Sequence, residues 1–239
     1  MQEVEIWNDI FASQLHCLYA EKQNAVIIAD LHLGYEGVLR MQGIMIPNYQ
    51  KEVIKERLKK IMEKYEPESI IVNGDFKHEF GKNLRQEWRE VGEMLEFLSQ
   101  KSNVFLIKGN HDNFLKTIAS KYNIPVKMQM EMDGITIAHG HVEIKGKKII
   151  MAHEHPSIHI RDKVGASLRL PCYMVSQSII VMPAFSPLAT GTDVSSTDAK
   201  EYLSPILQNE DVSAFHIWAI SEIGLLDFST IKQLKMARI

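Results

Sequence analysis

The sequence has few of the features that mark secreted, membrane or metal-thiolate proteins. Its two cysteines, Cys17 and Cys172, are too few and too far apart to suggest a disulfide framework or a thiolate metal site. No apolar run reaches the roughly 18 residues of a membrane span, because the longest, at 173–185, is interrupted by a Ser-Gln-Ser sequence. The N-terminal MQEVEIWNDIF is acidic where a signal peptide has a basic start. We therefore expect a soluble cytoplasmic protein with no membrane partner.

An excess of basic residues is also absent, since 27 Lys and Arg face 30 Asp and Glu and the formal net charge is −3. This balance argues against a surface coated with positive charge for non-specific nucleic-acid binding. The chain of 239 residues shows no repeat, low-complexity tract or Gly/Ser linker. We therefore expect a single α/β domain over 1–239, long enough to bury a substantial core.

Five short apolar runs stand out, and each stops abruptly at a polar cluster. They occupy residues 25–30, 69–75, 103–110, 134–140 and 147–154. Runs of this length with such boundaries are typical of buried strands in a sheet that is covered on both faces.

Helical patterns separate the first three runs. The segment after Pro47 has apolar residues on one helical face: Val53, Ile54, Leu58, Ile61, Met62 and Tyr65. A second helix is expected from Asn83, an N-cap with Gln86 three residues on, and would bury Leu84, Trp88, Val91, Leu95 and Leu98. A short helix should follow from about Asn113. The order β-α-β-α-β predicts parallel crossovers, and the rest reads as strands, with helix expected only near 197–207.

The ten histidines are the unusual feature, because seven of them lie in the polar clusters that end the five runs. The clusters are Asp30-Leu31-His32, Gly74-Asp75-Phe76-Lys77-His78, Gly109-Asn110-His111-Asp112, His139-Gly140-His141 and His153-Glu154-His155. Each alone has a structural explanation, such as a capping Asp, a Gly-Asn turn or a surface His pair. At the carboxyl ends of five strands of one sheet, they predict a shared site instead.

The residue types in these clusters indicate a site for two metal ions. Carboxylate, amide oxygen and imidazole are present without thiolate, a donor set that favours Mn, Fe or Zn over Ca or Cu(I). Asp75 has two carboxylate oxygens and can therefore bridge two ions. We expect two divalent ions, with Mn preferred and Fe or Zn as alternatives.

In order and spacing, these clusters resemble the motifs of the calcineurin-like metallophosphoesterases. That superfamily carries D-x-H, G-D-x-x-(D/H), G-N-H-(D/E), a His before Gly, and G-H-x-H, with Ala152 here in place of the last glycine. The phrases DLHLGYE, GDFKHEF, HEHPSI and PAFSPLATGTDV are similar to the small phosphoesterases related to SbcD-type DNA nucleases and to ligase-associated DNA repair endonucleases. The resemblance implies an α/β fold, a four-layer α/β/β/α sandwich.

The resemblance also implies a role for each motif residue. It assigns one metal to Asp30, His32, Asp75 and His155, and the other to Asp75, Asn110, His139 and His153. A hydroxide between the two ions would attack phosphorus. His111 would protonate the leaving group or stabilise the transition state, with Asp112 orienting its ring.

Other polar residues of these motifs have two open readings. For His78 and His141, hydrogen bonding to the ligands is preferred over contact with substrate. Basic residues form a turn just before the fifth strand and also follow the HEHP motif. They are Lys145, Lys147 and Lys148 in the turn, and Arg161, Lys163 and Arg169 after the motif. A solvated face is the preferred interpretation, and the alternative is contact with a polyanion, with Arg161 reaching a substrate phosphate.

Three functions are compatible with these residues. The favoured one is a two-metal phosphodiesterase that acts on DNA or RNA, a nuclease of the SbcD-related type with a role in DNA repair. The alternative is a phosphodiesterase or phosphatase for nucleotides or other small phosphate esters. A third is a catalytically silent scaffold, which predicts eroded ligands, whereas all the ligand positions are intact. The sequence leaves the oligomeric state open, a homodimer included.

Overall fold

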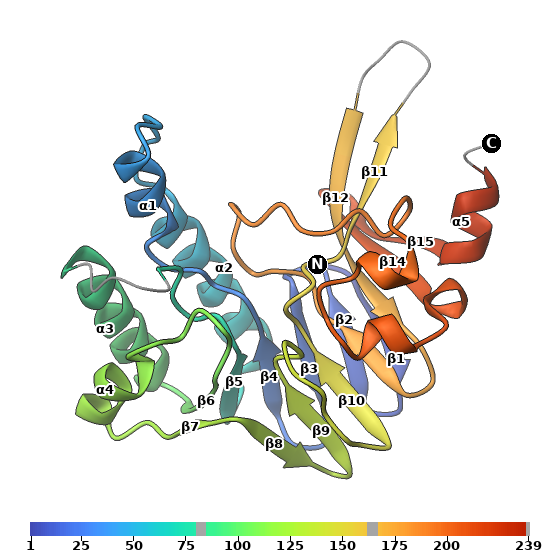
Figure 1. The fold of residues 1–239 in the computed structure, drawn as a ribbon. Coiled ribbons are helices and arrows are strands. Elements are labelled where there is room, and N and C mark those ends of the chain that lie inside the picture. The colour runs from blue at the N-terminus through green and yellow to red at the C-terminus, as the bar shows by residue number, and fades with distance from the viewer. Residues whose placement is uncertain (80–84, 162–166, 238–239) are drawn as a thin grey trace.

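The computed structural model describes residues 1–79, 85–161 and 167–237. Two β-sheets pack against each other, and most of the helices lie on one side of the pair (Figure 1). Within the described ranges, no helix is long and apolar enough to cross a membrane. Cys17 and Cys172 are both buried free thiols, so they form no disulfide with each other.

The first sheet has seven strands in chain order. They are β1 (Glu3–Trp7), β2 (Ile10–Ser13), β3 (Cys17–Ala20), β4 (Ala25–Ile28), β5 (Ser69–Asn73), β6 (Asn103–Ile107) and β7 (Val126–Lys127). Strands β1 to β4 are antiparallel, whereas β4 to β7 are parallel, as the β-α-β-α-β order predicts. The sequence patterns did not indicate β1 to β3, which are short and joined by tight turns.

The second sheet has eight strands, in the order β15-β14-β12-β13-β10-β9-β8 with β11 paired to β12. They are β8 (Gln129–Met132), β9 (Ile135–Ala138), β10 (Lys148–Met151), β11 (Ser157–Arg161), β12 (Ser167–Val175), β13 (Ile179–Val181), β14 (His216–Ser221) and β15 (Gly224–Thr230). The expectation that one sheet holds all five motif strands is wrong, because β9 and β10 belong to this second sheet. A strand that is apolar on both faces carries no sign of which sheet it joins.

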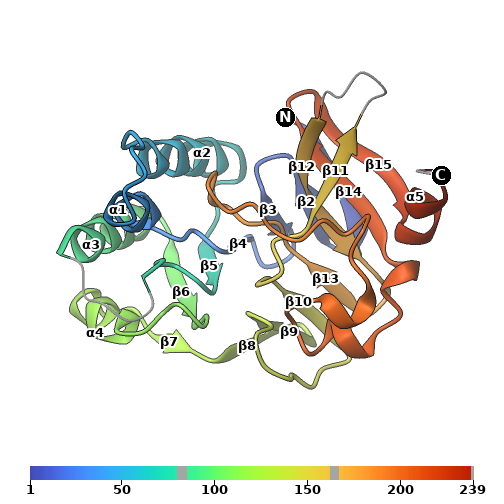
Figure 2. The same cartoon turned by 45° about the horizontal axis from the view of Figure 1, so that its top comes forward.

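In the described residues, five α-helices accompany the sheets. They are α1 (Tyr35–Met41), α2 (Gln50–Tyr65), α3 (Arg85–Ser99), α4 (Leu115–Ala119) and α5 (Ile231–Ala237). Helix α2 confirms the expected helix after Pro47, and its Ile54, Leu58 and Ile61 are buried. The expected start of α3 at Asn83 lies outside the described residues. Helix α1 and the β11–β12 pair lie on opposite sides of the molecule (Figure 2).

The helix expected near 197–207 is absent, and two 3-10 helices take its place. They are η2 (Ala199–Glu201) and η3 (Leu207–Asn209). Pro205 lies between them, and proline can neither donate a helical hydrogen bond nor follow a helical residue without a clash. A third, η4 (Val212–Ala214), precedes β14.

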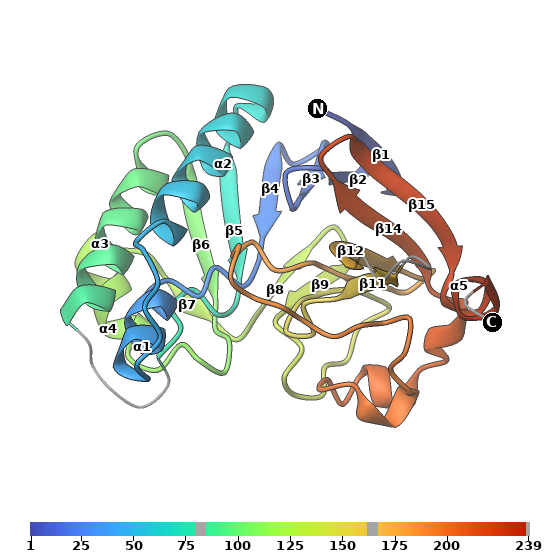
Figure 3. The ribbon, with the colours of Figure 1, turned by 90° about the horizontal axis from the view of Figure 1, so that it is seen from above.

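Alternating side chains of the strands divide the interior into three apolar layers. In β5, Ile70 and Val72 pack toward α2 and α3, whereas Ile71 faces the second sheet. In β10, Ile150 packs between the sheets, and Ile149 and Met151 face outward. Figure 3 shows α2 and α3 beside the first sheet and α5 beyond the second. The four-layer α/β/β/α arrangement is confirmed, with a thin fourth layer of α5 and the 3-10 helices.

Tyr173 of β12 joins the two sheets through its hydroxyl group. The buried O–H lies between two carbonyl oxygens of the β2–β3 turn, 2.8 Å from that of Ser13 and 2.9 Å from that of Cys17. Buried carbonyls that lose their donor cost more than an exposed hydrogen bond does. This hydroxyl is therefore a point of attachment between the sheets.

We expect Tyr173→Phe to lower the free energy of unfolding by about 1–3 kcal/mol, because it leaves buried carbonyl oxygens without a donor. Urea denaturation followed by circular dichroism measures the change. Tyr122→Phe, at a residue that is 37% exposed, is the control and should change stability by less than about 0.5 kcal/mol. Equal effects of the two substitutions would contradict the role of the Tyr173 hydroxyl.

Candidate metal centre

The five motifs occupy the loops that follow β4, β5, β6, β9 and β10, and backbone hydrogen bonds join these loops. The N–H groups of Asp30 and His32 donate to the carbonyl oxygens of Gly74 and Asp75, at 3.1 and 2.9 Å. In the second sheet, the N–H of Ala152 donates to the carbonyl oxygen of His139 at 3.0 Å. Residues far apart in the chain are thus fixed at one edge of the two sheets.

The backbone of this edge is left-handed at an unusual number of residues with side chains. Asp30 (φ 55°), His32 (47°), Asp75 (44°), His153 (67°) and His155 (47°) all have positive φ. Each such residue costs on the order of 1–3 kcal/mol and persists only where surrounding contacts hold it. All five are predicted metal ligands, and strain of this kind is typical of functional sites.

The first group of candidate ligands consists of Asp30, His32, Asp75 and His155, whose ligand atoms lie within 4.8 Å of one another. His155 Nε2 is 3.4 Å from Asp30 Oδ2. His32 Nε2 is 3.8 Å from Asp75 Oδ2 and 3.2 Å from His155 Nε2. Ring nitrogens and carboxylate oxygens therefore converge on one point.

The second group consists of Asp75, His139 and His153, also within 4.8 Å. His139 Nε2 lies 3.4 Å from Asp75 Oδ2 and 3.1 Å from the side-chain oxygen of Asn110. The other ring nitrogen of His139, Nδ1, faces the carbonyl oxygen of Asn73 at 3.3 Å. This contact leaves Nε2 as the nitrogen available to a metal.

The residues present fit divalent metal ions. Asp30 Oδ1 is buried and accepts no hydrogen bond from the described residues, and a buried oxygen without a donor is costly unless a cation compensates it. The donors are oxygen and imidazole nitrogen, which suit hard or borderline metals. Asp75 belongs to both groups, so its carboxylate lies between the two candidate positions.

Burial and the two carboxylates determine the protonation of the site. Burial lowers the pKa of His32 to about 3 and that of His153 to about 4, which leaves both imidazoles in the neutral form that binds metal. His139 is also buried, but the carboxylates of Asp75 and Asp30 raise its pKa to about 9. Burial acts to raise the pKa of Asp75, and the neighbouring imidazoles hold it below its ordinary value. A divalent cation supplies the positive charge that protons on these rings otherwise provide.

Close approach explains the glycines of two motifs. A Cβ atom on Gly109 would lie 2.1 Å from Asp75 Oδ1, and one on Gly74 would lie 2.1 Å from Nδ1 of His139. Gly74 also has a φ of 84°, which L side chains rarely adopt. The carboxylate and imidazole can occupy their places only because these positions have no side chain.

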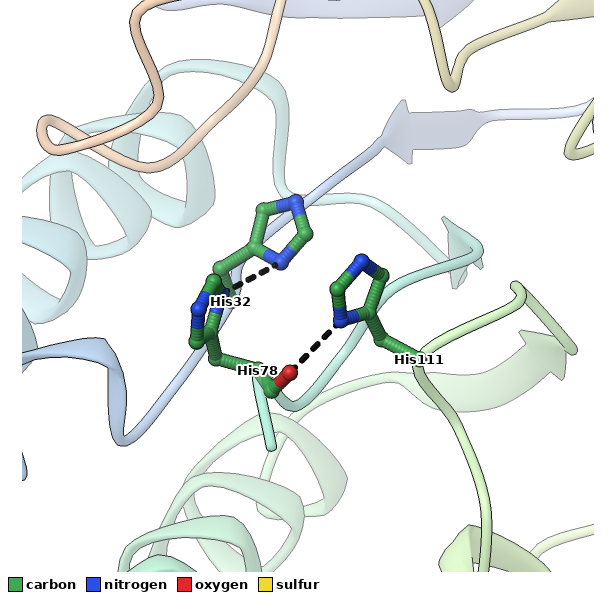
Figure 4. Close-up of side chains that lie close together, drawn as sticks. All are labelled: His32, His78 and His111. Carbon is green, nitrogen blue, oxygen red and sulfur yellow. Dashed lines mark hydrogen bonds between the residues drawn. The ribbon is translucent and has the colours of Figure 1, made fainter. Parts of the chain in front are cut away.

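His111 and His78 lie beside the first group, and Figure 4 shows them together with His32. The Nδ1 atoms of His32 and His78 are 3.3 Å apart, and His111 Nδ1 lies 2.6 Å from the carbonyl oxygen of His78. Tyr35 stacks on His78, with ring centroids 3.7 Å apart. The backbone N–H of His111 donates to Asp75 Oδ1 at 2.9 Å. His78 is therefore close enough to hydrogen-bond to His32, a candidate metal ligand. Its role in function stays a prediction.

The carboxylate of Asp112 was expected to orient the His111 ring, but it contacts backbone N–H groups. Its buried carboxylate accepts the backbone N–H of Gly109 at 2.8 Å and that of Lys77 at 3.3 Å. Burial and the charge of Asp75 raise the pKa of Asp112 to about 6. Asp112 therefore ties the loops after β5 and β6 together, while the carbonyl oxygen of His78 faces the His111 ring.

Two further predicted site residues, His141 and Arg161, have fewer described contacts. His141 lies beside His139 and His153, with ring centroids 5.2 and 6.1 Å apart, and its buried Nδ1 has no hydrogen-bond partner in the described ranges. Arg161 ends β11, and its side chain lies outside the described part of the structure.

Gln50 and Ser186 hold the ligand loops, and the sequence patterns did not single them out. The amide of Gln50 donates to the carbonyl oxygen of His32 at 2.8 Å and to Ser186 Oγ at 2.9 Å. Ser186 in turn donates its backbone N–H to the carbonyl oxygen of Asp30 at 3.1 Å. In the sequence, a glutamine at the start of a helix looks like an ordinary surface residue. Only the structure shows that Gln50 is buried, with 1% of its surface exposed.

Two buried glutamates support the other loops. Glu154, between the histidines of the fifth motif, accepts the backbone N–H groups of Leu203 and Ser204 at 2.9 and 3.1 Å. Glu87 of α3 accepts the backbone N–H of His78 at 3.1 Å and forms an ion pair with buried Lys77 at 3.4 Å. Glu154 thus holds the segment 153–155 in place, and Glu87 holds His78.

Two facing sheets with a His/Asp cluster at their common edge define an α/β protein with a candidate metal centre. The family model of the calcineurin-like phosphoesterases matches residues 24–215, and the chain belongs to this family. It is therefore a metal-dependent phosphoesterase.

Comparison with solved structures supports the fold. The nuclease MPE of Pseudomonas putida is similar with a TM-score of 0.70 at 18% identity, over 95% of this chain and 99% of that one. Yfce, a phosphoesterase from E. coli, gives a TM-score of 0.40 at 13% identity, over 70% of this chain and 83% of that one. Comparison with curated proteins finds no match.

We expect Gln50→Leu to weaken Mn²⁺ binding by about 10- to 100-fold, because it releases the carbonyl oxygen of the strained ligand His32. Isothermal titration calorimetry measures the affinity. Gln129→Leu, an exposed position in β8, makes the same chemical change away from the site and should leave the affinity unaltered. If a folded Gln50→Leu protein binds Mn²⁺ as wild type does, Gln50 has no role in positioning His32.

Proposed function

We propose that the chain is a two-metal phosphodiesterase that acts on nucleic acid. The carrying observation is the position of Asp75, whose carboxylate belongs to both groups of candidate ligands. A carboxylate that is shared by two groups of imidazoles would suit a pair of divalent ions. The solved nuclease that shares the fold over nearly the whole chain supports nucleic acid as the substrate.

The ligands follow from the two groups. Asp30, His32, Asp75 and His155 would hold one ion, and Asp75, Asn110, His139 and His153 the other. Mn²⁺ is proposed, with Fe or Zn as alternatives, because oxygen and imidazole donors occur without thiolate. When bound, such ions lower the pKa of water and neutralise charge on the phosphoryl oxygens.

His111 is proposed to protonate the leaving group. Its backbone N–H holds Asp75, and its ring is oriented by the carbonyl oxygen of His78 at Nδ1. With Nδ1–H used in this bond, Nε2 is the atom that exchanges a proton with a departing oxygen. His78 and His141 are proposed to hydrogen-bond to the ligands, with contact to substrate as the alternative.

The net charge of −3 does not oppose an anionic substrate. Two divalent ions would outweigh the carboxylates of Asp30 and Asp75, so the local charge at the loaded site would be positive. Nucleotides and other small phosphate esters remain the second candidate substrate class, because they need the same ligands. A silent scaffold, the third candidate, is disfavoured because the structure brings the predicted ligands together. Cytoplasmic location and homodimer formation stay predictions.

We expect the purified chain with Mn²⁺ to hydrolyse bis(p-nitrophenyl) phosphate and to lose this activity on chelation. Release of p-nitrophenol measures the rate, and added Mn²⁺ should restore it. Asp75→Asn should abolish it, since it removes a carboxylate that serves both ions. A well-folded chain that is inactive with Mn, Fe and Zn would favour the scaffold.

The substrate is tested by side-by-side assays of single-stranded DNA, double-stranded DNA, RNA and small diesters with Mn²⁺. The proposal requires nucleic acid to be cleaved more efficiently, by kcat/KM, than the small diesters. Preference for a small diester would overturn the nucleic-acid part and leave the phosphodiesterase intact.

We expect His111→Ala to keep the metal but to lower kcat by about 10²–10⁴-fold, as the loss of a general acid does. Metal content is measured by atomic spectroscopy alongside the kinetics. A substrate with a good leaving group, p-nitrophenol, should be less affected than a nucleic acid, because it needs less protonation. Loss of metal from the variant would show instead that His111 is a ligand.

A further inference from the structure

A cavity lies outside the candidate metal centre and shares no residue with it. It has a volume of about 770 Å³, within the range of roughly 300–1,000 Å³ typical of small-molecule sites. Its walls come from the β2–β3 turn, α2, the start of β12 and the β14–β15 turn. The residues that line it include His16, Arg57, Lys60, Leu168, Glu222 and Ile223.

The segment 184–186 separates this cavity from the metal centre. On the cavity side, His16 Nδ1 contacts the carbonyl oxygen of Ala184 at 3.1 Å, and Arg57 donates to that of Phe185 at 2.7 Å. On the other side, the N–H of Phe185 donates to the carbonyl oxygen of Ala29 at 2.8 Å. Figure 2 shows the orange segment passing between α2 and β3.

The cavity wall carries positive charge without a full set of partners. Arg57 lies over the ring of Phe185 at 5.0 Å, and no carboxylate of the described residues forms an ion pair with it. Burial lowers the pKa of Arg57 to about 10, so the group is still charged at neutral pH. Burial and Arg57 lower the pKa of His16 to about 3. Lys60 is the second basic residue that lines the cavity, after Arg57. Glu222 is the acidic residue of the lining, so basic residues outnumber acidic ones there.

The rest of the wall is apolar and partly open to water. Leu168 is 55% exposed and Ile223 is 87% exposed, although both line a concave surface. Leu170 and Leu226 extend the same wall. Apolar side chains left in contact with water favour a ligand with an apolar body.

We propose that this cavity binds a small amphipathic anion. A carboxylate, sulfonate or phosphate head pairs with Arg57, whose planar guanidinium matches such groups. The apolar body lies against Leu168, Leu170 and Ile223. The site is separate from the metal centre, and its existence does not depend on the reaction carried out there.

The test is calorimetric titration of the Mn²⁺-loaded protein with three probes. Decanoate has both the head and the body, inorganic phosphate has the anion alone, and decyltrimethylammonium has the body with a cation. We expect decanoate to bind at one site and the other two at least about tenfold more weakly. Equal binding of decyltrimethylammonium, or no saturable binding of decanoate, would overturn the proposal.

Variants locate the binding. Arg57→Met and Leu168→Asp should each weaken decanoate binding by about tenfold or more. Leu168→Asp keeps the test valid if Arg57→Met fails to fold, because Leu168 is an exposed residue. Lys59→Met is the matched control, since Lys59 lies on α2 outside the cavity and pairs with Glu56. Decanoate binding that is unchanged in Leu168→Asp would place the probe elsewhere.

One further variant separates this cavity from the metal centre. Decanoate could bind through its carboxylate to Mn²⁺, and Asp75→Asn removes a ligand that both metal positions share. We expect this variant to bind decanoate within about twofold of wild type, because the sites share no residue. Loss of binding in Asp75→Asn would assign decanoate to the metal centre and overturn the proposal, while the phosphodiesterase would stand.

Discussion

The structure of the site depends on the burial of two carboxylates, Asp30 and Asp75, at one edge of two sheets. Two buried negative charges are stable only with positive charge between them. His139 lies between them, 3.6 Å from Asp30 Oδ1 and 3.4 Å from Asp75 Oδ2. The same two carboxylates that raise the pKa of this imidazole make the position attractive to divalent metal. Charge as well as ligand type therefore favours a divalent ion at this position.

This arrangement is held by contacts that come from outside the motifs. Asp30 and His32 have left-handed backbones, which would relax in an unconstrained loop. Gln50 and Ser186 fix their carbonyl oxygens, and Glu154 fixes the loop that carries His153 and His155. The strain is therefore maintained by a buried polar network, and this preorganises the ligands before an ion arrives.

The sequence predicted which candidate ligands lie together because their motifs are local, with two or three residues at fixed spacing after an apolar strand. It could not reveal which sheet each strand joins, since both sheets have apolar faces on both sides. It also missed Gln50 and Glu154, whose importance rests on contacts with residues far away in the chain. Asp112 shows the same limit: its place beside His111 in sequence suggested a contact with the ring, but its carboxylate turns to the backbone of Gly109 and Lys77.

The segment 184–186 lies between the cavity lined by Arg57 and the loop that carries Asp30. It has no secondary structure of its own, yet it receives bonds from Arg57 and His16 on one side and donates bonds to Ala29 and Asp30 on the other. A buried backbone segment must find partners for its polar groups, and here those partners belong to both a positively charged cavity and a ligand of the metal centre. The segment that holds the carbonyl oxygen of Asp30 is therefore also held by Arg57, a cation outside the candidate metal centre.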